Sequence, residues 1–363
     1  MVAKGPIVYI AKRAVILYLT VVVSSYLTIY VANMGGFIDE VIKGQLWEDI
    51  VYSVKRNPEY MYLPPVEQER IIKQFYELEI KRRGLDTPFI IRSFIYLKDA
   101  LTLDLGRAIY MTSDTGSRMV RNIILERLPA TVLLFTTAQV INFFLHLFIG
   151  LYLSRHYGSK LDKLFIALAP TSIIPGWLYG IILILIFAGF LRNPFNPNEP
   201  FLPWGGIVSV PPPEDPILYA LDVLRHMILP LLSWIIAGFF MGGYSSRTFF
   251  LIFSTEDFVL TAKAKGLPPR LIETRYILRP SLPPIITSFS LGLIGSWSGA
   301  IITETVFNWP GLGQVMNQAI AALDTPVLIG VTVIYAYLLA TTVLILDIIY
   351  GFIDPRIKAT FRG

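Results

Sequence analysis

Long runs of apolar residues, separated by charged connections, dominate the pattern of this chain. A helix needs about 20 apolar residues to cross the hydrocarbon core of a bilayer. These runs are too long and continuous for barrel strands, and unpaired backbone groups are not tolerated in lipid, so helices are predicted. The fold class is an all-α membrane protein with six spanning helices, predicted at residues 14–32, 130–153, 164–191, 227–253, 280–303 and 326–350.

Charged residues are rare inside these six segments. Only Arg247 and Asp347 occur there, near the ends of the fourth and the sixth. For the first segment a cleaved signal peptide is the alternative, because Lys4, Lys12 and Arg13 precede the apolar run. The run of 19 residues is longer than a usual signal-peptide core, and no clear small-x-small site follows it. We therefore favour a retained span.

Basic residues are distributed unevenly among the connections, which predicts the orientation. Fifteen Lys and Arg residues lie at the termini, between the second and third segments, and between the uncharged parts of the fourth and fifth. The connections 192–226 and 304–325 hold two. Because short loops rich in Lys and Arg stay in the cytoplasm, we expect a multi-pass protein of the cell membrane. Its termini, residues 1–13 and 351–363, and the loop 254–279 are predicted to be cytoplasmic.

Residues 33–128 form a long connection that is predicted to lie outside the cell. It holds 14 basic and 14 acidic residues, but long loops cross the membrane regardless of charge. Apolar residues follow helical spacing over 66–83, between helix start and stop signals at Pro64-Pro65 and Gly84. We expect a small external helical subdomain that docks a partner, with a simple spacer as the alternative. The Pro-rich connection 192–226 is expected to be an ordered, extended cap.

The composition excludes several kinds of chemistry. The 363 residues include no cysteine, which excludes disulfides and thiolate metal sites. The three histidines, His146, His156 and His226, are scattered, so no histidine metal cluster is predicted. No GxxxxGK[ST] motif occurs, and an ATP-driven process would need another chain to bind the nucleotide. The net charge of +5 is explained by topology rather than by nucleic-acid binding. We expect no catalytic residue, no metal and no bound cofactor.

The predicted cytoplasmic segment 254–284 has the pattern of a compact basic knob. Ser254-Thr255-Glu256-Asp257 is a helix start, in which a hydroxyl caps the first amides. A short helix follows over 257–265 and ends at Gly266, and Pro268-Pro269 begins a second short helix through about Leu278. A rigid knob seated in a soluble partner would transmit motion to the spans. From charge alone, a solvated loop that merely sets topology is the favoured alternative.

A family resemblance favours the knob. The sequence of residues 258–267 resembles the cytoplasmic coupling loop of permease subunits of ABC importers. Its T-A-x-A-K-G form is similar to the version in the dipeptide/oligopeptide/nickel permease family. The general E-A-A triplet of such loops is replaced here by Leu260-Thr261-Ala262, so the generic pattern matches loosely and the subfamily pattern well.

Four further stretches resemble this family in the expected order, at residues 103–106, 226–230, 299–313 and 347–357. In that order, they resemble the family's external motif before its second helix, the entry into its fourth helix, the outer end of its fifth helix, and its C-terminal exit from the membrane. One departure is the sequence Asn33-Met34-Gly35-Gly36, where the family often has a P-G-D-P-like turn.

The resemblance implies a type I ABC importer permease fold and a specific set of partners. These are a second, homologous but non-identical permease, two cytoplasmic ATPase subunits that bind ATP and Mg, and an external substrate-binding protein. The residues implied to couple to the ATPase are Asp257, Thr261, Ala262, Lys263, Ala264, Lys265, Gly266 and Leu267. The implied cargo is di- or oligopeptides. The family also carries oligosaccharides and nickel, and no residue discriminates among them.

Two rival classes remain from the sequence. An ion-gradient-driven secondary transporter usually shows inverted repeats and charges within the membrane, and neither pattern occurs here. A membrane-embedded enzyme would need histidines or acids clustered at membrane depth, which the sequence also lacks.

Three polar residues are candidates for lining the transport pathway. Asn142 and His146 are four residues apart on one face of the second predicted span, and they line a pore or hydrogen-bond a neighbouring helix. Glu304 directly follows the fifth span at its outer end, where it touches the pathway or is held by the turn at 309–311. For Asp347 we expect an ion pair with a cytoplasmic base such as Arg356.

Small and aromatic residues add two expectations about packing. Gly238, Gly242 and Gly243 predict close approach of the fourth span to another helix, within the chain or in a second subunit. Trp204 and Trp309 lie near span ends, where tryptophan is typical of the membrane interface.

Overall fold

The computed structural model describes residues 4–33, 37–82, 84–297 and 301–353. Within those ranges the regular secondary structure is helical, and the extended pairings are two isolated bridges, Arg107–Met119 and Arg192–Pro200. The chain divides into two compact units. One contains residues 1–13, 127–317 and 341–363, and the other contains residues 14–126 and 318–340.

Four helices of the described ranges are long and apolar enough to cross a membrane. They are α1 (Lys4–Asn33), α5 (Val120–Arg155), α8 (Pro216–Ser254) and α14 (Thr325–Ile353). Each contains one of the predicted spans. The structure therefore confirms an all-helical protein with several spans, and the full count of six stays a prediction.

The predicted third span is bent rather than straight. Its residues lie in α6 (Lys160–Leu168) with η1 (Ala169–Ile173), and in α7 (Gly176–Ile184) with η2 (Leu185–Phe190), and the two halves meet at 91°. The bend lies at Pro175, which has extended backbone angles and precedes the first residue of α7. Proline cannot continue the hydrogen-bond ladder of the preceding helix, which explains why an uninterrupted apolar run forms two helices.

The predicted fifth span is only partly described. Its helix, α11 (Arg279–Trp297), contains Pro283 and Pro284, and a further short helix, α12 (Ile301–Val306), follows beyond the undescribed residues 298–300. Polar and proline residues dilute the hydropathy of α11, so it is not one of the four long apolar helices.

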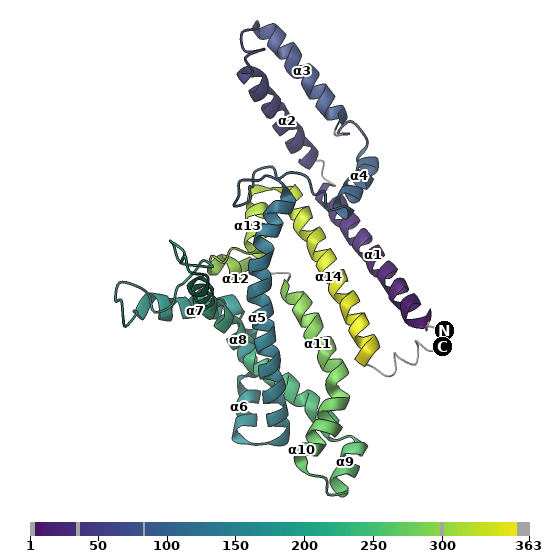
Figure 1. Ribbon diagram of the computed structural model, residues 1–363, viewed down its shortest axis with the longest axis vertical. Helices are drawn as coiled ribbons and strands as arrows, with labels where there is room; N and C mark the ends of the chain where they lie inside the picture. The colour runs from purple at the N-terminus through teal and green to yellow at the C-terminus, as the bar shows by residue number, and fades with distance from the viewer. Residues whose placement is uncertain (1–3, 34–36, 83, 298–300, 354–363) are drawn as a thin grey trace. The chain divides into compact units, whose positions relative to one another are not determined.

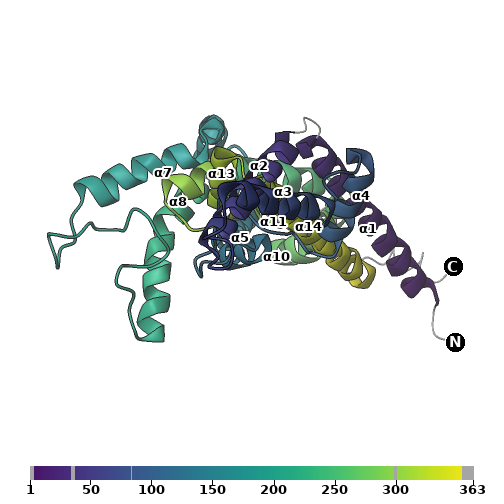
Figure 2. The same ribbon diagram turned by 90° about the horizontal axis from the view of Figure 1, so that it is seen from above.

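The core of the first unit lies where α5, α7 and α8 meet the turn after α12. Leu134 and Phe135 of α5, Met227 and Leu229 of α8, and Trp309 are all buried in one cluster. Between η2 and α8, residues 192–215 form no helix, and Figure 2 shows this segment looping outward. The prediction of an extended cap over 192–226 is wrong for residues 216–226, which belong to α8. The helix α8 begins at Pro216 because Asp215 caps it, accepting from the backbone N–H groups of Ile217 and Leu218.

The second unit contains the helices of the long first connection. The helices α2 (Phe37–Arg56) and α3 (Pro65–Arg82) lie side by side as a hairpin (Figure 1). Leu46, Ile50 and Val54 of α2 pack against Ile72 of α3. The predicted helix at 66–83 corresponds to α3. A third helix, α4 (Phe89–Leu101), follows and packs on α1 and α14 through Ile29, Ala100 and Val333.

A buried carboxylate organises the loop that leads from α4 to α5. Asp324 is fully buried, and its two oxygens accept from the backbone N–H groups of Ile109, Tyr110 and Met111 at 2.8–3.1 Å. These bonds join segments that are more than 200 residues apart in sequence, and they hold the loop against the turn between α13 (Leu312–Ala322) and α14.

Candidate coupling surface and transport cavity

The predicted knob begins with a short helix, α9 (Asp257–Ala264). Its N-cap residue is Glu256, with no side-chain capping bond among the described residues, so the predicted hydroxyl cap is wrong. The hydroxyl of Thr255 instead donates to the carbonyl of Ile252 at 2.9 Å, at the end of α8. The local reason is that Thr255 has helical backbone angles and belongs to the preceding helix as its C-cap.

A left-handed glycine ends α9, as the sequence predicts. Gly266 has φ +72°, and its N–H donates to the carbonyl of Lys263 at 2.9 Å. Leu267 then closes the turn by donating to Ala262 at 3.3 Å. A Cβ at Gly266 would meet no atom of the described residues within 4 Å, so the requirement for glycine is conformational rather than steric.

The return from the knob to the membrane is one continuous helical path. It consists of α10 (Pro269–Leu271), the π-helical segment η3 (Ile272–Leu278) and α11, rather than a short helix that ends near Arg279. The wider π turn ends at Leu278, two residues before Pro280, which cannot donate a backbone hydrogen bond. A local change of helical pitch before a proline lets the helix continue.

The knob is seated on the chain's own core. Val259 and Ala262 of α9 are buried, and they pack in one cluster with Leu151 of α5, Phe250 of α8, and Ile272 and Ile277 of η3. Figure 1 shows α9 and α10 together at the ends of α8 and α11. These apolar contacts join α9 to the ends of α5 and α8 and to η3.

The opposite face of α9 is free in the described chain. Asp257, Thr261, Lys263, Ala264, Lys265 and Gly266 are exposed, and Leu267 is half-buried. Phe258 and Leu260 are also exposed, at 42% and 50%. The sequence did not single out these two apolar side chains. Of the predicted coupling residues, Ala262 lies on the buried face, so it supports the helix rather than presenting a surface.

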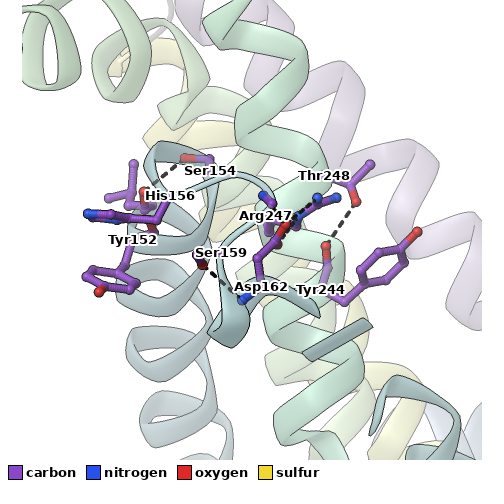
Figure 3. A network of polar contacts seen from close by, with 10 residues as sticks. Tyr152, Ser154, His156, Ser159, Asp162, Tyr244, Arg247 and Thr248 are labelled. Atoms are coloured by element: carbon purple, nitrogen blue, oxygen red, sulfur yellow. Dashed lines mark hydrogen bonds and ion pairs between the residues drawn. The ribbon is translucent and has the colours of Figure 1, made fainter. Parts of the chain in front are cut away.

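Two ion pairs fix the elements next to the knob. Arg155 at the end of α5 contacts Glu273 of η3 at 2.8 Å. Arg247 of α8 forms a two-pronged pair with Asp162 of α6, with Nε–Oδ1 at 2.5 Å and the second contact at 2.9 Å (Figure 3). Asp162 also accepts from the N–H of Gly158 at 2.9 Å.

The Arg247–Asp162 pair is nearly sealed from solvent, with side-chain exposures of 9% and 1%. The guanidinium lies 4.9 Å from the centre of the Tyr157 ring. A fixed guanidinium fork that meets both carboxylate oxygens holds two helices in one geometry. The sequence indicated Arg247 only as a charge near a span end and gave no partner.

A cavity of about 610 Å³ lies between α5, α8 and α11. Its lining includes Asn142 and His146 from the predicted pathway set, together with Gln139, Ser245 and Ser288. Asn142 Oδ1 and His146 Nε2 are buried atoms without a hydrogen-bond partner among the described residues.

Glycines bring α5 and α8 into close contact beside this cavity. A Cβ at Gly242 would lie 2.1 Å from the His146 ring of α5. One at Gly243 would lie 3.1 Å from Ile149 of α5 and 2.6 Å from Phe165 of α6. The close packing predicted for the fourth span is therefore present within the chain. Its physical role is to let the imidazole of His146 lie directly against the backbone of α8.

Glu304 does not line the cavity between α5, α8 and α11; it is fully buried in α12. Its carboxylate accepts from the hydroxyl of Thr131 at 2.8 Å and from the backbone N–H of Gln314 at 3.0 Å. Thr131 in turn accepts from the N–H of Leu312 at 2.7 Å, so the pair caps the start of α13. Burial raises the pKa of Glu304 to about 7, although these hydrogen bonds by themselves lower that pKa. Its pathway role stays a prediction.

Of two other sequence expectations, the structure corrects the one for Trp309 and bears out the one for Asp347. Trp309 is fully buried and donates to the carbonyl of Ala130 at 2.9 Å, so it packs the core rather than anchoring an interface. Trp204 is 54% exposed. Asp347 pairs with Arg13 at 2.5 Å, so the expected ion pair with a base of the predicted cytoplasmic segments is present. Arg356, the example given for such a base, lies outside the described residues.

Comparison with known proteins gives consistent relatives. Residues 146–359 match the family described as binding-protein-dependent transport system inner membrane component. An oligopeptide transport system permease protein of Bacillus subtilis, AppB, is 29% identical, with 77% of this chain and 84% of the relative covered.

Two further relatives are similar at 31% identity. One is the dipeptide transport system permease protein DppB of Bacillus subtilis, with 77% of this chain and 82% of the relative covered. The other is the probable D,D-dipeptide transport system permease protein DdpB of Escherichia coli, with 76% and 82% covered. The family match spans more than half of the chain and includes both α9 and the cavity-lining part of α8 and α11. The chain therefore belongs to the family of binding-protein-dependent transport system inner membrane components, and it is a multi-pass membrane permease subunit.

Proposed function

We propose that the chain is one permease of an ATP-driven peptide importer and that α9 couples it to a cytoplasmic ATPase. It would pair with a second, homologous permease, two ATPase subunits that hold ATP and Mg, and an external binding protein that delivers the peptide. The chain itself would perform no bond chemistry. Its contribution would be half of the pathway and the mechanical link to the ATPase.

The strongest support for coupling is the two-sided character of α9. One face is fixed by Val259 and Ala262 to the ends of α5 and α8, and the other face is free. The free face combines two lysines with exposed Phe258 and Leu260, a mixture that suits docking in an apolar groove with an acidic rim. When the two ATPases close on ATP, the docked knob would move as a rigid body and would rotate the attached helices.

The orientation that this mechanism needs follows from the loop charges. The knob and both termini lie on the side with the excess of Lys and Arg, which is the cytoplasmic side by the positive-inside rule. The ion pair between Arg13 and Asp347 is consistent with this arrangement, because it joins residues next to the two termini.

The peptide cargo is supported by the relatives and by the chemistry of the cavity. All three relatives described above are named as peptide permeases. Polar side chains, including Gln139, Ser245 and Ser288, line a space of about 610 Å³ and could hydrogen-bond the backbone amides of a peptide. Among the described residues, no group of three or more His, Asp or Glu side chains could hold a metal ion, so nickel is not supported by a site.

The coupling role is tested by changing the turn that ends α9. Gly266→Val forces a β-branched residue into left-handed backbone, at a cost of about 1–2 kcal/mol or more, whereas Gly266→Asn is tolerated there. In proteoliposomes of the complete importer, we expect Gly266→Val to reduce uptake of labelled trialanine and the ATP hydrolysis that accompanies it. Membrane insertion should persist, and Gly266→Asn should keep most activity. Unchanged uptake with valine would count against the coupling role.

A further inference from the structure

The helix α4 (Phe89–Leu101) has an inverted distribution of polar and apolar side chains. Ile90, Ile91, Phe94 and Ile95 are exposed, at 64%, 58%, 58% and 47%. At 3.6 residues per turn these four fall within an arc of about 140° on one face. The opposite face holds Arg92, which is only 2% exposed.

The buried face of α4 has polar partners inside the unit, although Arg92 Nε has none among the described residues. Arg92 forms an ion pair with Asp39 of α2 and lies 5.8 Å from the ring centre of Tyr96. The neighbouring Ser93 is fully buried and donates to the carbonyl of Ile90 at 2.7 Å. A helix that turns its arginine inward and its isoleucines outward is unfavourable against water, since large apolar side chains would stay hydrated. The same arrangement is expected where the outer face meets hydrocarbon.

The position of α4 on α1 indicates what covers this face. Phe94 stacks on Tyr26 of α1, with ring centres 5.3 Å apart, and Phe89 lies 5.7 Å from the ring centre of Tyr30. Both tyrosines are in the last two turns of the candidate span Val8–Ala32, at the depth where aromatic belts form. The exposed stripe of this span, which includes Val23, Leu27 and Val31, would face lipid.

The apolar face of α4 is therefore continuous with a lipid-facing surface. We propose that α4 is an interfacial membrane helix, inserted into the leaflet at the α4 end of α1, with lipid as the occupant of its Ile90–Ile91–Phe94–Ile95 face. Lys98 follows on the same face, where its ammonium can reach lipid phosphates while its stem lies along the apolar surface. Residues 89–101 are thus a membrane-surface element rather than part of an aqueous docking subdomain. With the orientation proposed above, the leaflet is the outer one.

The hairpin α2–α3 provides a matched contrast. Leu78 of α3 is as exposed as Ile90, at 63%, but its helix intersperses such residues with charges including Glu67, Glu69 and Lys73. A mixed surface of this kind is typical of contact with water. Labels on α4 and on α3 should therefore report different surroundings, although both helices present exposed apolar side chains.

Single-cysteine spin labels test this placement, because the chain has no cysteine of its own. The labelled positions would be Ile91→Cys in α4, Val23→Cys in α1 as the lipid reference, and Leu78→Cys in α3 as the water reference. The full chain would be reconstituted in vesicles of phosphatidylcholine and phosphatidylglycerol, alone and with its partner subunits. Collision with O₂, which partitions into lipid, would be compared with collision with a water-soluble nickel chelate.

We expect the label at Ile91 to match the one at Val23, with more O₂ than nickel collision, and the label at Leu78 to show the reverse. The proposal is overturned if Ile91 matches Leu78. It is also overturned if Ile91 is open to nickel in the chain alone and shielded from both reagents in the assembled importer, because a protein then covers the face. Since neither reading depends on transport, the proposal can fail while the importer function stands, and the reverse also holds.

Discussion

The buried ion pair between Arg247 and Asp162 allows a quantitative prediction. The substitution Arg247→Met keeps much of the side-chain volume and removes the cation, which leaves a carboxylate that is 1% exposed. Of the bonds to that carboxylate, both guanidinium contacts at 2.5 and 2.9 Å are lost and the one from Gly158 at 2.9 Å remains. Breaking one side of a buried pair destabilises a protein by about 3–5 kcal/mol.

The double variant separates the pair from its surroundings. In Asp162→Asn with Arg247→Met, no unpaired charge is left buried, so the loss should be smaller than the sum of the two single losses by about 1–3 kcal/mol. Arg247→Lys should be intermediate, because an ammonium keeps the charge but cannot form the two-pronged contact. The exposed Arg270 of α10 serves as the control, and Arg270→Met should stay within about 0.5 kcal/mol of the parent.

Unfolding in detergent, followed by helix content against temperature and denaturant, measures these differences. The reasoning is refuted if Arg247→Met changes stability no more than Arg270→Met does. It is also refuted if the losses of stability at the two positions simply add, because the two side chains would then have no interaction energy.

Three further predictions concern stability. Asp324→Ala removes the acceptor of three backbone N–H groups and should cost about 3 kcal/mol or more, read as a lower denaturant midpoint. Gly242→Ala places a Cβ 2.1 Å from the His146 ring and should cost about 1–3 kcal/mol, whereas Gly44→Ala, with open space around it, should be neutral or stabilising. The folded-state pKa of Glu304 is raised to about 7, so the stability that Glu304 contributes is full below about pH 4.5 and is lost as pH rises through 7. The free energy of unfolding should therefore be lower at pH 8.5 than at pH 6, and Glu304→Gln should abolish this difference.

Local signals in the sequence predicted the knob well. The helix at 257–265, its glycine end and the proline that follows are properties of neighbouring residues, and the structure has α9 at Asp257–Ala264 with Gly266 at φ +72°. The helix expected at 66–83 is present as α3 for the same reason. The four-residue spacing of Asn142 and His146 also predicted that they share one helix face, and the structure shows both lining a common cavity.

Contacts between distant residues were beyond the reach of these signals. The pairing of Asp347 with Arg13 joins residues 334 apart, and no local pattern distinguishes Arg13 from Arg356 as the partner. Trp309 looked like an interface anchor because its neighbours are loop residues, yet tertiary packing buries it against Ala130. The 91° bend within residues 160–190 was missed because apolar length alone does not show how a proline divides a run.

Cross-linking from the free face of α9 tests the central claim most directly. A photoreactive label on Lys263→Cys would be compared with the same label on Asn198→Cys in the exposed segment 192–215, in the complete importer with its ATPases. The absence of native cysteine confines each label to one site. We predict that the label at 263 cross-links to an ATPase subunit and that the label at 198 does not. An intact, labelled complex in which position 263 cross-links to no ATPase, or in which position 198 does, would contradict the assignment of α9 as the coupling element.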